Sequence, residues 1–124
     1  MPSELAGRRI LLVEDSPVVA ELAQEMLEEL GCIVVGPAGN LATARILAET
    51  EAIDAGLIDV RIRGDKSFAI CDILAARRLP FILTSGYADW AVAEKWRDSA
   101  RLPKPYALPD LERALVELLA EAPN

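Results

Sequence analysis

Residues 10–17 read Ile-Leu-Leu-Val-Glu-Asp-Ser-Pro, and this stretch decides the fold. Four consecutive apolar residues are typical of a short strand that is buried on both faces. Ser16 and Pro17 then supply an N-cap and a first-turn residue for a helix. Two carboxylates, Glu14 and Asp15, stand between the strand and the helix. The stretch therefore predicts a strand, an acidic turn and a helix in succession.

The same pattern of strand followed by helix repeats along the chain, with no linker or low-complexity segment. The expected strands are 10–13, 32–35, 55–60, 79–84 and 100–102. The expected helices are 17–30, 40–51, 66–77, 88–97 and 108–120. Nearly continuous apolar strands that alternate with helices predict an α/β fold. Its sheet should be parallel, with helices on both faces and right-handed crossovers.

The expected helices carry apolar residues at helical spacing, and we expect these residues to face the sheet. In the first helix they are Val18, Leu22, Met26 and Leu30, while Glu21, Gln24, Glu25 and Glu28 point outward. In the second they are Leu41, Ala44, Leu47 and Ala48. In the third they are Phe68, Cys71 and either Leu74 or Ala75, and in the last Leu111, Leu115, Leu118 and Leu119.

Composition excludes several classes of function. The 124 residues suffice for one core, so we expect a single domain over residues 1–124 with its core at about 8–121. The chain has 13 basic and 20 acidic residues, and the resulting net charge of −7 argues against direct binding to nucleic acid. It has no histidine, which excludes histidine-based general base catalysis and most transition-metal sites.

The chain also lacks the features of an exported or membrane protein. No apolar run near its start reaches the roughly 20 residues that span a bilayer, and no basic-then-apolar leader is present. We therefore expect a cytoplasmic protein without membrane contact, and Met1 with the polar residues 121–124 favours a complete chain. Cys32 and Cys71 stand far apart without histidine or CxxC companions, so both are expected to be reduced and mostly buried.

Chemically active side chains gather where the expected strands end, which is where open parallel sheets bind their ligands. They are Glu14, Asp15, Asp59, Thr84, Ser85 and Lys104. Three converging carboxylates repel one another unless a cation intervenes, and oxygen-only ligands favour Mg²⁺. Lys104 would add a positive charge, Ser85 a hydroxyl and Asp59 a nucleophile toward phosphorus. Taken singly, each residue is also typical of a turn, a helix cap or a solvated surface; their occurrence together favours a site.

These residues resemble the motifs of the receiver domain of two-component response regulators, and the resemblance covers essentially the whole chain. The motifs are Glu14-Asp15 after Leu11-Leu12-Val13, Asp59 after Leu57-Ile58, Thr84-Ser85-Gly86, and Lys104-Pro105. Together they are specific, although each alone is weak. The resemblance implies a flavodoxin-like (βα)5 fold, in which a five-stranded parallel sheet has the strand order 2-1-3-4-5.

The resemblance also implies a role for each site residue. Asp59 would accept a phosphoryl group from a histidine kinase or phosphotransfer protein. Asp15 and Asp59 would bind Mg²⁺ directly, with the backbone carbonyl of Arg61 as a further ligand, while Glu14 would act mostly through water. Lys104 would pair with the phosphoryl oxygens, and the Lys104-Pro105 bond is expected to be cis.

Residues 80–87, Pro-Phe-Ile-Leu-Thr-Ser-Gly-Tyr, resemble a receiver sub-family that reads Pro-Phe-x-Phe-Ala-Thr-Gly-Tyr at this place. The alignment assigns the switch hydroxyl to Ser85, with Thr84 as a neighbouring modulator. Members of this sub-family commonly stand alone and serve histidine kinases of the HWE and HisKA2 types. Arg61 and Tyr87 are expected to tune the lifetime of the phosphoryl group. The simpler interpretations are a solvated loop cation for Arg61 and a ring packed over the fourth strand for Tyr87.

Two residues depart from the common receiver pattern. Arg101 occupies the position, three residues before the lysine, where most receivers carry Tyr or Phe, so the usual aromatic switch cannot operate as such. Glu14 replaces the commoner first Asp, and its longer side chain should still reach a metal-bound water. Of the two tryptophans in the expected fourth helix, Trp90 and Trp96, one could cover the core and the other could anchor a partner.

The sequence thus predicts a single-domain response regulator, which is a signalling protein and not an enzyme. It would act through a downstream protein or as a phosphorelay shuttle or sink, as a monomer or as a phosphorylation-dependent dimer. Two alternatives remain. One is a phosphorylation-independent binding module. The other is an aspartyl-phosphate hydrolase, which typically carries a second Asp where this chain has Arg61.

Overall fold

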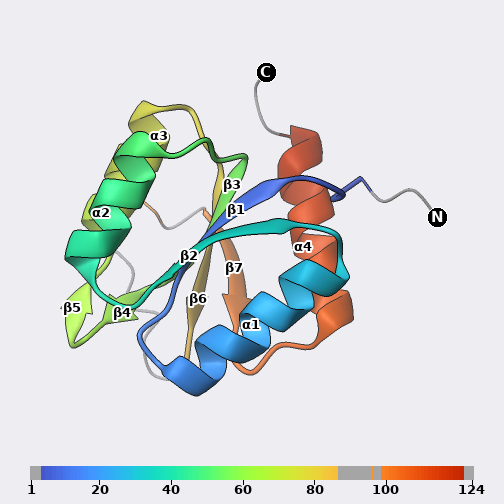
Figure 1. Ribbon diagram of the computed structural model, residues 1–124, viewed down its shortest axis with the longest axis horizontal. Coiled ribbons are helices and arrows are strands. Elements are labelled where there is room, and N and C mark those ends of the chain that lie inside the picture. The colour runs from blue at the N-terminus through green and yellow to red at the C-terminus, as the bar shows by residue number, and fades with distance from the viewer. Residues whose placement is uncertain (1–3, 87–95, 97–98, 122–124) are drawn as a thin grey trace.

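A five-stranded parallel sheet forms the centre of the molecule in the computed structural model, which describes residues 4–86, 96 and 99–121 (Figure 1). Its strands lie in the order β2-β1-β3-β6-β7. They are β1 (Arg9–Val13), β2 (Ile33–Ala38), β3 (Ala55–Asp59), β6 (Phe81–Ser85) and β7 (Ala100–Pro103). Because β6 and β7 are the fourth and fifth strands of this sheet in chain order, the predicted order 2-1-3-4-5 is confirmed.

The described helices cover both faces of the sheet. They are α1 (Pro17–Glu29), α2 (Leu41–Thr50), α3 (Phe68–Ala76) and α4 (Leu108–Glu121). Figure 1 shows α2 and α3 on one face and α1 and α4 on the other. The expected helix at 88–97 lies outside the described residues, apart from Trp96.

Short polar side chains begin α1 and α2, as the sequence predicts. The Ser16 hydroxyl accepts a hydrogen bond from the backbone N–H of Val19 at 3.4 Å, and Pro17 follows in the first turn. The Asn40 side chain accepts from the backbone N–H of Thr43 at 2.8 Å. Each cap satisfies an N–H that has no partner within its helix. The caps therefore fix the points at which the chain turns back from the carboxyl edge of the sheet.

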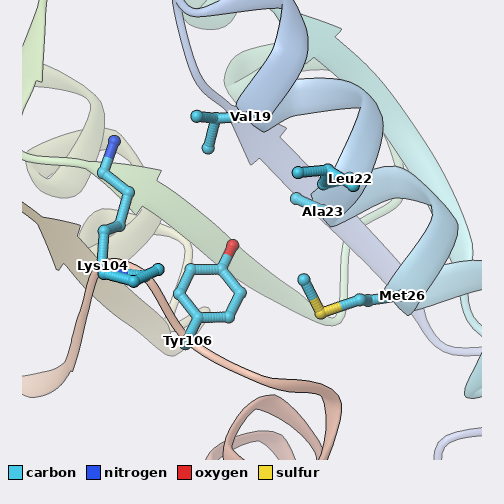
Figure 2. A pocket seen from close by; sticks show the side chains of 7 residues that line it. Val19, Leu22, Ala23, Met26, Lys104 and Tyr106 are labelled. Atoms are coloured by element: carbon cyan, nitrogen blue, oxygen red, sulfur yellow. The ribbon is translucent and has the colours of Figure 1, made fainter.

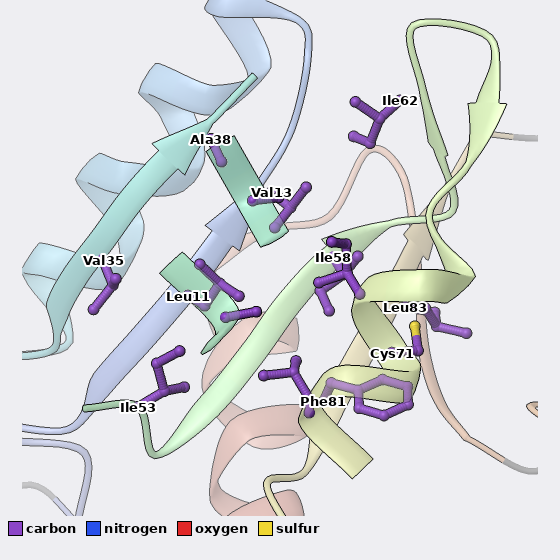
Figure 3. Close-up of a cluster of buried hydrophobic side chains, with 14 of the residues drawn as sticks. Leu11, Val13, Val35, Ala38, Ile53, Ile58, Ile62, Cys71, Phe81 and Leu83 are labelled. Carbon is purple, nitrogen blue, oxygen red and sulfur yellow. The ribbon is translucent and has the colours of Figure 1, made fainter. Parts of the chain in front are cut away.

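The central strands contribute side chains to two separate hydrophobic cores, because successive side chains of a strand point to opposite faces of the sheet. Leu11 and Val13 enter the core beneath α2 and α3, part of which Figure 3 shows. Ile10 and Leu12 enter the core beneath α1 and α4. The one described tryptophan, Trp96, covers the first core and meets the Phe81 ring edge-on, with centroids 5.2 Å apart.

Both cysteines are buried and free, in agreement with the sequence. Cys71 lies in the core beneath α2 and α3, and Cys32 in the opposite core. Burial raises the pKa of the Cys71 thiol to about 12 and that of Cys32 to about 11, so both stay protonated at neutral pH.

The predicted inner face of the first helix is wrong at two positions. Val18 and Leu22 are 69% and 51% exposed, whereas Ala20, Ala23 and Leu27 face the core. Both sets have helical spacing, so periodicity alone could not choose between them. The small alanines let the helix approach the sheet, which leaves the larger side chains outside. In α3 the two expected alternatives are resolved, since Leu74 is buried and Ala75 is exposed.

Two local features differ from the sequence prediction. β2 does not end before Gly36-Pro37 but continues through it to Ala38, with a positive φ at Gly36 and a cis bond to Pro37. A small antiparallel hairpin, β4 (Arg61–Ile62) and β5 (Asp65–Lys66), occupies the expected loop before α3. The helix consequently starts at Phe68 and not at Lys66. No helix within 4–86 or 99–121 is long and apolar enough to cross a bilayer.

Gly56 provides a test of the packing between β3 and α3. An added Cβ would lie 2.8 Å from Leu74 Cδ1, 3.2 Å from Ile58 Cδ1 and 3.3 Å from Phe81 Cβ. Overpacking of a filled core costs about 1–3 kcal/mol, so we expect Gly56→Ala to lower the free energy of unfolding by this amount in urea. Gly86→Ala is the control, because a Cβ there meets no atom within 4 Å. Equal stability of the two variants would contradict the prediction.

Candidate functional site

The polar residues singled out in the sequence meet at the carboxyl edge of the sheet. Glu14 and Asp15 follow β1, Asp59 ends β3, and Lys104 follows β7. Backbone hydrogen bonds join neighbouring strands at this edge. The Val60 N–H, after β3, donates to the Thr84 carbonyl of β6 at 2.9 Å, and the Lys104 N–H, after β7, donates to the Ser85 carbonyl of β6 at 2.8 Å. The parallel topology thus brings together side chains that are up to 90 residues apart in the chain.

Three carboxylates form a cluster at this edge. Oxygens of Glu14, Asp15 and Asp59 lie within 4.8 Å of one another. Glu14 and Asp59 are each only 5% exposed, and Asp15 is half-buried. Close carboxylates raise one another's pKa and oppose ionisation unless positive charge is near. The cluster therefore requires positive charge nearby, and the protein itself supplies part of this positive charge.

Lys104 supplies this charge. Its ammonium Nζ lies 2.8 Å from Glu14 Oε1 and 2.8 Å from Asp59 Oδ2, and it donates to both. Burial is the largest single influence and lowers the pKa of Lys104, but the hydrogen bonds to Asp59 and Glu14 and the charges of these two acids together outweigh it and raise the pKa. Lys104 therefore keeps its charge at neutral pH and bridges the ends of β1 and β3.

Glu14 has a pKa above its ordinary value. Burial of its carboxyl group is the largest cause, and the neighbouring Asp59 adds to it. The hydrogen bonds from Lys104 and from the Ser16 N–H at 3.1 Å act in the opposite direction without cancelling burial. Ionisation of Glu14 therefore lowers the stability of the metal-free protein, and a bound cation would reduce this loss.

Backbone groups orient the two aspartates. The Arg61 N–H donates to Asp59 Oδ1 at 3.3 Å, and the Arg63 N–H donates to Asp15 Oδ2 at 2.7 Å. The fully buried Ser67 hydroxyl lies 2.5 Å from the carbonyl oxygen of Asp59 and 3.2 Å from that of Val60. Ser67 and Arg63 could not be found from the sequence, because neither belongs to a motif and they lie beside and within a hairpin that the sequence pattern does not predict.

The structure places the remaining expected residues as follows. Thr84 and Ser85 are both buried, with Thr84 level with Asp59 in the register and Ser85 one residue further on, its hydroxyl 3.2 Å from the Gly86 carbonyl. The side chain of Arg61 is exposed and donates to the Gly64 carbonyl. Arg101 is exposed on β7. The expected cis bond between Lys104 and Pro105 is present. Tyr87 and Trp90 lie outside the described residues.

An apolar groove adjoins the cluster. Figure 2 shows one side of α1 facing the segment that leaves β7, with Lys104 at one end and Tyr106 beside the helix. The groove has a volume of about 360 Å³ and is lined by Val19, Leu22, Ala23, Met26, Lys104, Pro105 and Tyr106. Burial raises the pKa of Tyr106 to about 12, so its hydroxyl is neutral.

The three carboxylates fit the requirements of Mg²⁺. This ion takes oxygen ligands at about 2.0–2.1 Å, so ligands on opposite sides of it are about 4.2 Å apart. The oxygens of Glu14, Asp15 and Asp59 already lie within 4.8 Å of one another, and small side-chain shifts would bring them to this spacing. The donor set therefore suits a hard divalent cation, with Lys104 limiting the remaining negative charge.

The fold and this edge define a doubly wound α/β protein with an acidic site at the carboxyl ends of its strands. The model of the response regulator receiver domain matches residues 10–115, and the chain belongs to that family. Receiver domains of this family are signalling modules of two-component systems, which agrees with the resemblance seen in the sequence.

Several named proteins are similar to this chain. The transcriptional regulatory protein PdtaR of Mycobacterium tuberculosis is 33% identical over 112 residues, which are 87% of this chain and 55% of PdtaR. The chain thus spans about half the length of this relative. SdrG from Sphingomonas melonis Fr1 is 37% identical, with a TM-score of 0.83 and coverage of 91% of this chain and 97% of SdrG.

A further solved structure is informative about metal. The receiver domain of the sensor histidine kinase PA1611 from Pseudomonas aeruginosa PAO1 is 28% identical, with a TM-score of 0.76. The similarity covers 94% of this chain and all of that domain, which has a magnesium ion coordinated in its active site cleft.

Glu14 predicts a specific pH dependence of stability. Because its folded pKa lies above the ordinary 4.5, the folded state binds more protons than the unfolded state between 4.5 and the raised value. Ionisation of Glu14 therefore reduces stability as the pH rises through this window. Glutamine has the same shape, stays neutral and can still accept from Lys104. We expect metal-free Glu14→Gln to gain stability relative to the wild type as the pH rises from about 4 to about 7.

Urea unfolding at several pH values measures this difference. Glu49→Gln, which changes a carboxylate 52% exposed on α2, is the matched control and should give a profile parallel to that of the wild type. A parallel profile for Glu14→Gln as well would contradict the prediction.

Proposed function

We propose that the protein is a response regulator that accepts a phosphoryl group on Asp59, in a Mg²⁺-dependent reaction, from a histidine kinase or phosphotransfer protein. It would then signal through protein contacts or pass the group on in a phosphorelay. The observation that carries the proposal is the Lys104 ammonium, 2.8 Å from Asp59 Oδ2, beside a cluster of three carboxylates. A nucleophile, a fixed cation and ligands for a divalent cation thus meet at one place.

The proposed reaction is transfer from phosphohistidine to a carboxylate. An oxygen of Asp59 attacks phosphorus, a P–O bond forms, the P–N bond breaks, and the imidazole leaves with its electron pair. Mg²⁺ bound by Asp15, Asp59 and the Arg61 carbonyl would neutralise charge on the phosphoryl oxygens. Lys104 would move its hydrogen bond from the Asp59 carboxylate to a phosphoryl oxygen, and the hydroxyl of Ser85 would donate to another.

Two of the comparisons support this proposal. The receiver domain of PA1611 holds magnesium in its cleft. SdrG, 37% identical to this chain, has also been solved in a BeF3-activated conformation. The present chain shares their fold and has three clustered carboxylates at the carboxyl edge of its sheet, which supports the same chemistry here.

We propose that the signal leaves the site through Ser85 and the segment that follows Gly86. Arg101, which takes the place of the usual aromatic switch residue, is exposed on β7, so a ring that swings inward is not available at that position. Thr84 and Ser85 are buried at the end of β6, where Thr84 is level with Asp59 in the register, and a phosphoryl group on Asp59 would favour a conformation in which the Ser85 hydroxyl donates to it.

We also propose that α1 and the adjoining groove receive the histidine kinase. Val18 and Leu22 are large apolar side chains exposed on α1, and Leu22 lines the groove that leads to Lys104. Scattered apolar residues need no explanation, but a groove with exposed apolar side chains next to a reactive site is typical of a binding surface. A partner seated there would present its phosphohistidine to Asp59.

Phosphorylation can be tested with acetyl phosphate. We expect the protein to gain the mass of one phosphoryl group in the presence of Mg²⁺, and not after chelation with EDTA. Asp59→Asn should abolish the gain, while Asp72→Asn, which changes an exposed acid on α3, should retain it. Absence of labelling in the wild type, or equal labelling of Asp59→Asn, would favour a phosphorylation-independent module. Continuous release of phosphate without a labelled protein would favour a hydrolase.

Docking on α1 is tested with a second pair of variants. Leu22→Glu should slow phosphotransfer from an HWE-type or HisKA2-type kinase that labels the wild type, by about tenfold if Leu22 is a central contact. Ile46→Glu is the control, because Ile46 is equally apolar and 60% exposed but lies on α2, across the sheet. Both variants should react normally with acetyl phosphate. Equal transfer rates for the two variants would contradict docking on α1.

A further inference from the structure

The β4–β5 hairpin has a turn of unusual composition. Its two strands pair Arg61 with Lys66 and Ile62 with Asp65, which leaves Arg63 and Gly64 as a two-residue turn. Both turn residues have positive φ angles, 51° at Arg63 and 85° at Gly64. These angles match a type I′ turn, which strongly favours Asn, Asp or Gly at its first central position. An arginine there carries a steric cost that those residues avoid.

Two contacts of Arg63 offset this cost. Its backbone N–H donates to Asp15 Oδ2 at 2.7 Å, and its guanidinium Nε donates to the Gly39 carbonyl at 3.3 Å. Left-handed residues that persist in spite of their cost occur where the surrounding structure requires them, and often at functional sites. The backbone N–H of Arg63 thus binds Asp15, which is one of the three carboxylates of the cluster.

The hairpin is anchored well enough to hold Asp15. Ile62, next to Arg63, is 1% exposed and belongs to the core beneath α2 and α3. Gly39, bound by the Arg63 side chain, follows Ala38, whose carbonyl accepts from the Glu14 N–H at 3.0 Å. Arg63, in the loop after β3, therefore links this loop to those after β1 and β2, and the loop after β1 carries Glu14 and Asp15.

We propose that Arg63 is a positioning residue for the divalent cation site. By donating its backbone N–H to one oxygen of Asp15, it holds that carboxylate in place and leaves it further lone pairs for the ion. The left-handed backbone at position 63 is the essential element, and the guanidinium is secondary. This inference rests on the proposed function, since it assumes that Asp15 is a metal ligand.

Substitutions at Arg63 separate its backbone role from its side chain. Arg63→Asn removes the guanidinium but favours the left-handed conformation, so the N–H stays in place. Arg63→Val disfavours that conformation and should withdraw the N–H from Asp15. Arg78→Val is the matched control, because Arg78 is an exposed arginine with φ of 61° that lies between α3 and the start of β6, at the amino edge of the sheet and not at the carboxyl edge with the acids.

Binding of Mn²⁺, followed by electron paramagnetic resonance, and of Mg²⁺, followed by calorimetry, provides the readout. Loss of a group that orients a metal ligand typically costs at least tenfold in metal affinity, so we expect Arg63→Val to raise the Kd about tenfold. Arg63→Asn and Arg78→Val should stay within about twofold of the wild type. In the metal-free wild type, the Arg63 amide should be protected from hydrogen exchange, and Asp15→Ala should remove this protection.

Three results would overturn the inference: wild-type affinity in Arg63→Val, an equal loss in Arg78→Val, or an equal loss in Arg63→Asn. If the wild type binds no divalent cation, the proposed function and this inference fail together. If the wild type binds the ion and is phosphorylated while Arg63→Val binds it as tightly, this inference alone fails.

Discussion

The ammonium group of Lys104 is the contact on which the candidate site depends. It lies 2.8 Å from an oxygen of Glu14 and 2.8 Å from an oxygen of Asp59, and both carboxylates are buried. Two carboxylates in such surroundings would be strongly disfavoured in their ionised form without a positive partner. Because Lys104 stands 45 residues from Asp59 and 90 from Glu14, this compensation exists only when the whole sheet has formed. Fold and site are thus completed by the same event.

The parallel sheet explains why the polar side chains of the candidate site gather at one edge. Its central strands β1, β3 and β6 are almost entirely buried and mostly apolar, which leaves their carboxyl ends as the place for polar side chains. Asp59 and Thr84 are level in the register of β3 and β6, and Ser85 follows one residue further along β6. The proposed path of the signal through Ser85 follows from this neighbourhood.

Strand order, most helix positions and the meeting of Glu14, Asp15, Asp59 and Lys104 could all be predicted from the sequence. The helix positions follow from apolar periodicity, the meeting of the acids and Lys104 from the rule that ligands collect at the carboxyl edge, and the strand order from the resemblance to receiver domains. The exposure of Val18 and Leu22 could not be predicted, because it depends on how closely the alanines of α1 approach the sheet. Nor could Arg63 and Ser67 be found, since their contacts are made by a backbone N–H and by a hydroxyl that meets two backbone carbonyls.

The two sides of α1 differ in composition. Its buried side is made mainly of small residues, Ala20 and Ala23, together with Leu27. Its largest exposed apolar side chains, Val18 and Leu22, contribute little to the core. Substitutions on the outer side can therefore accumulate after gene duplication without loss of the fold or of the acidic site. With the proposed docking on α1, such a helix would allow related regulators in one cell to diverge in partner choice while their common chemistry is retained.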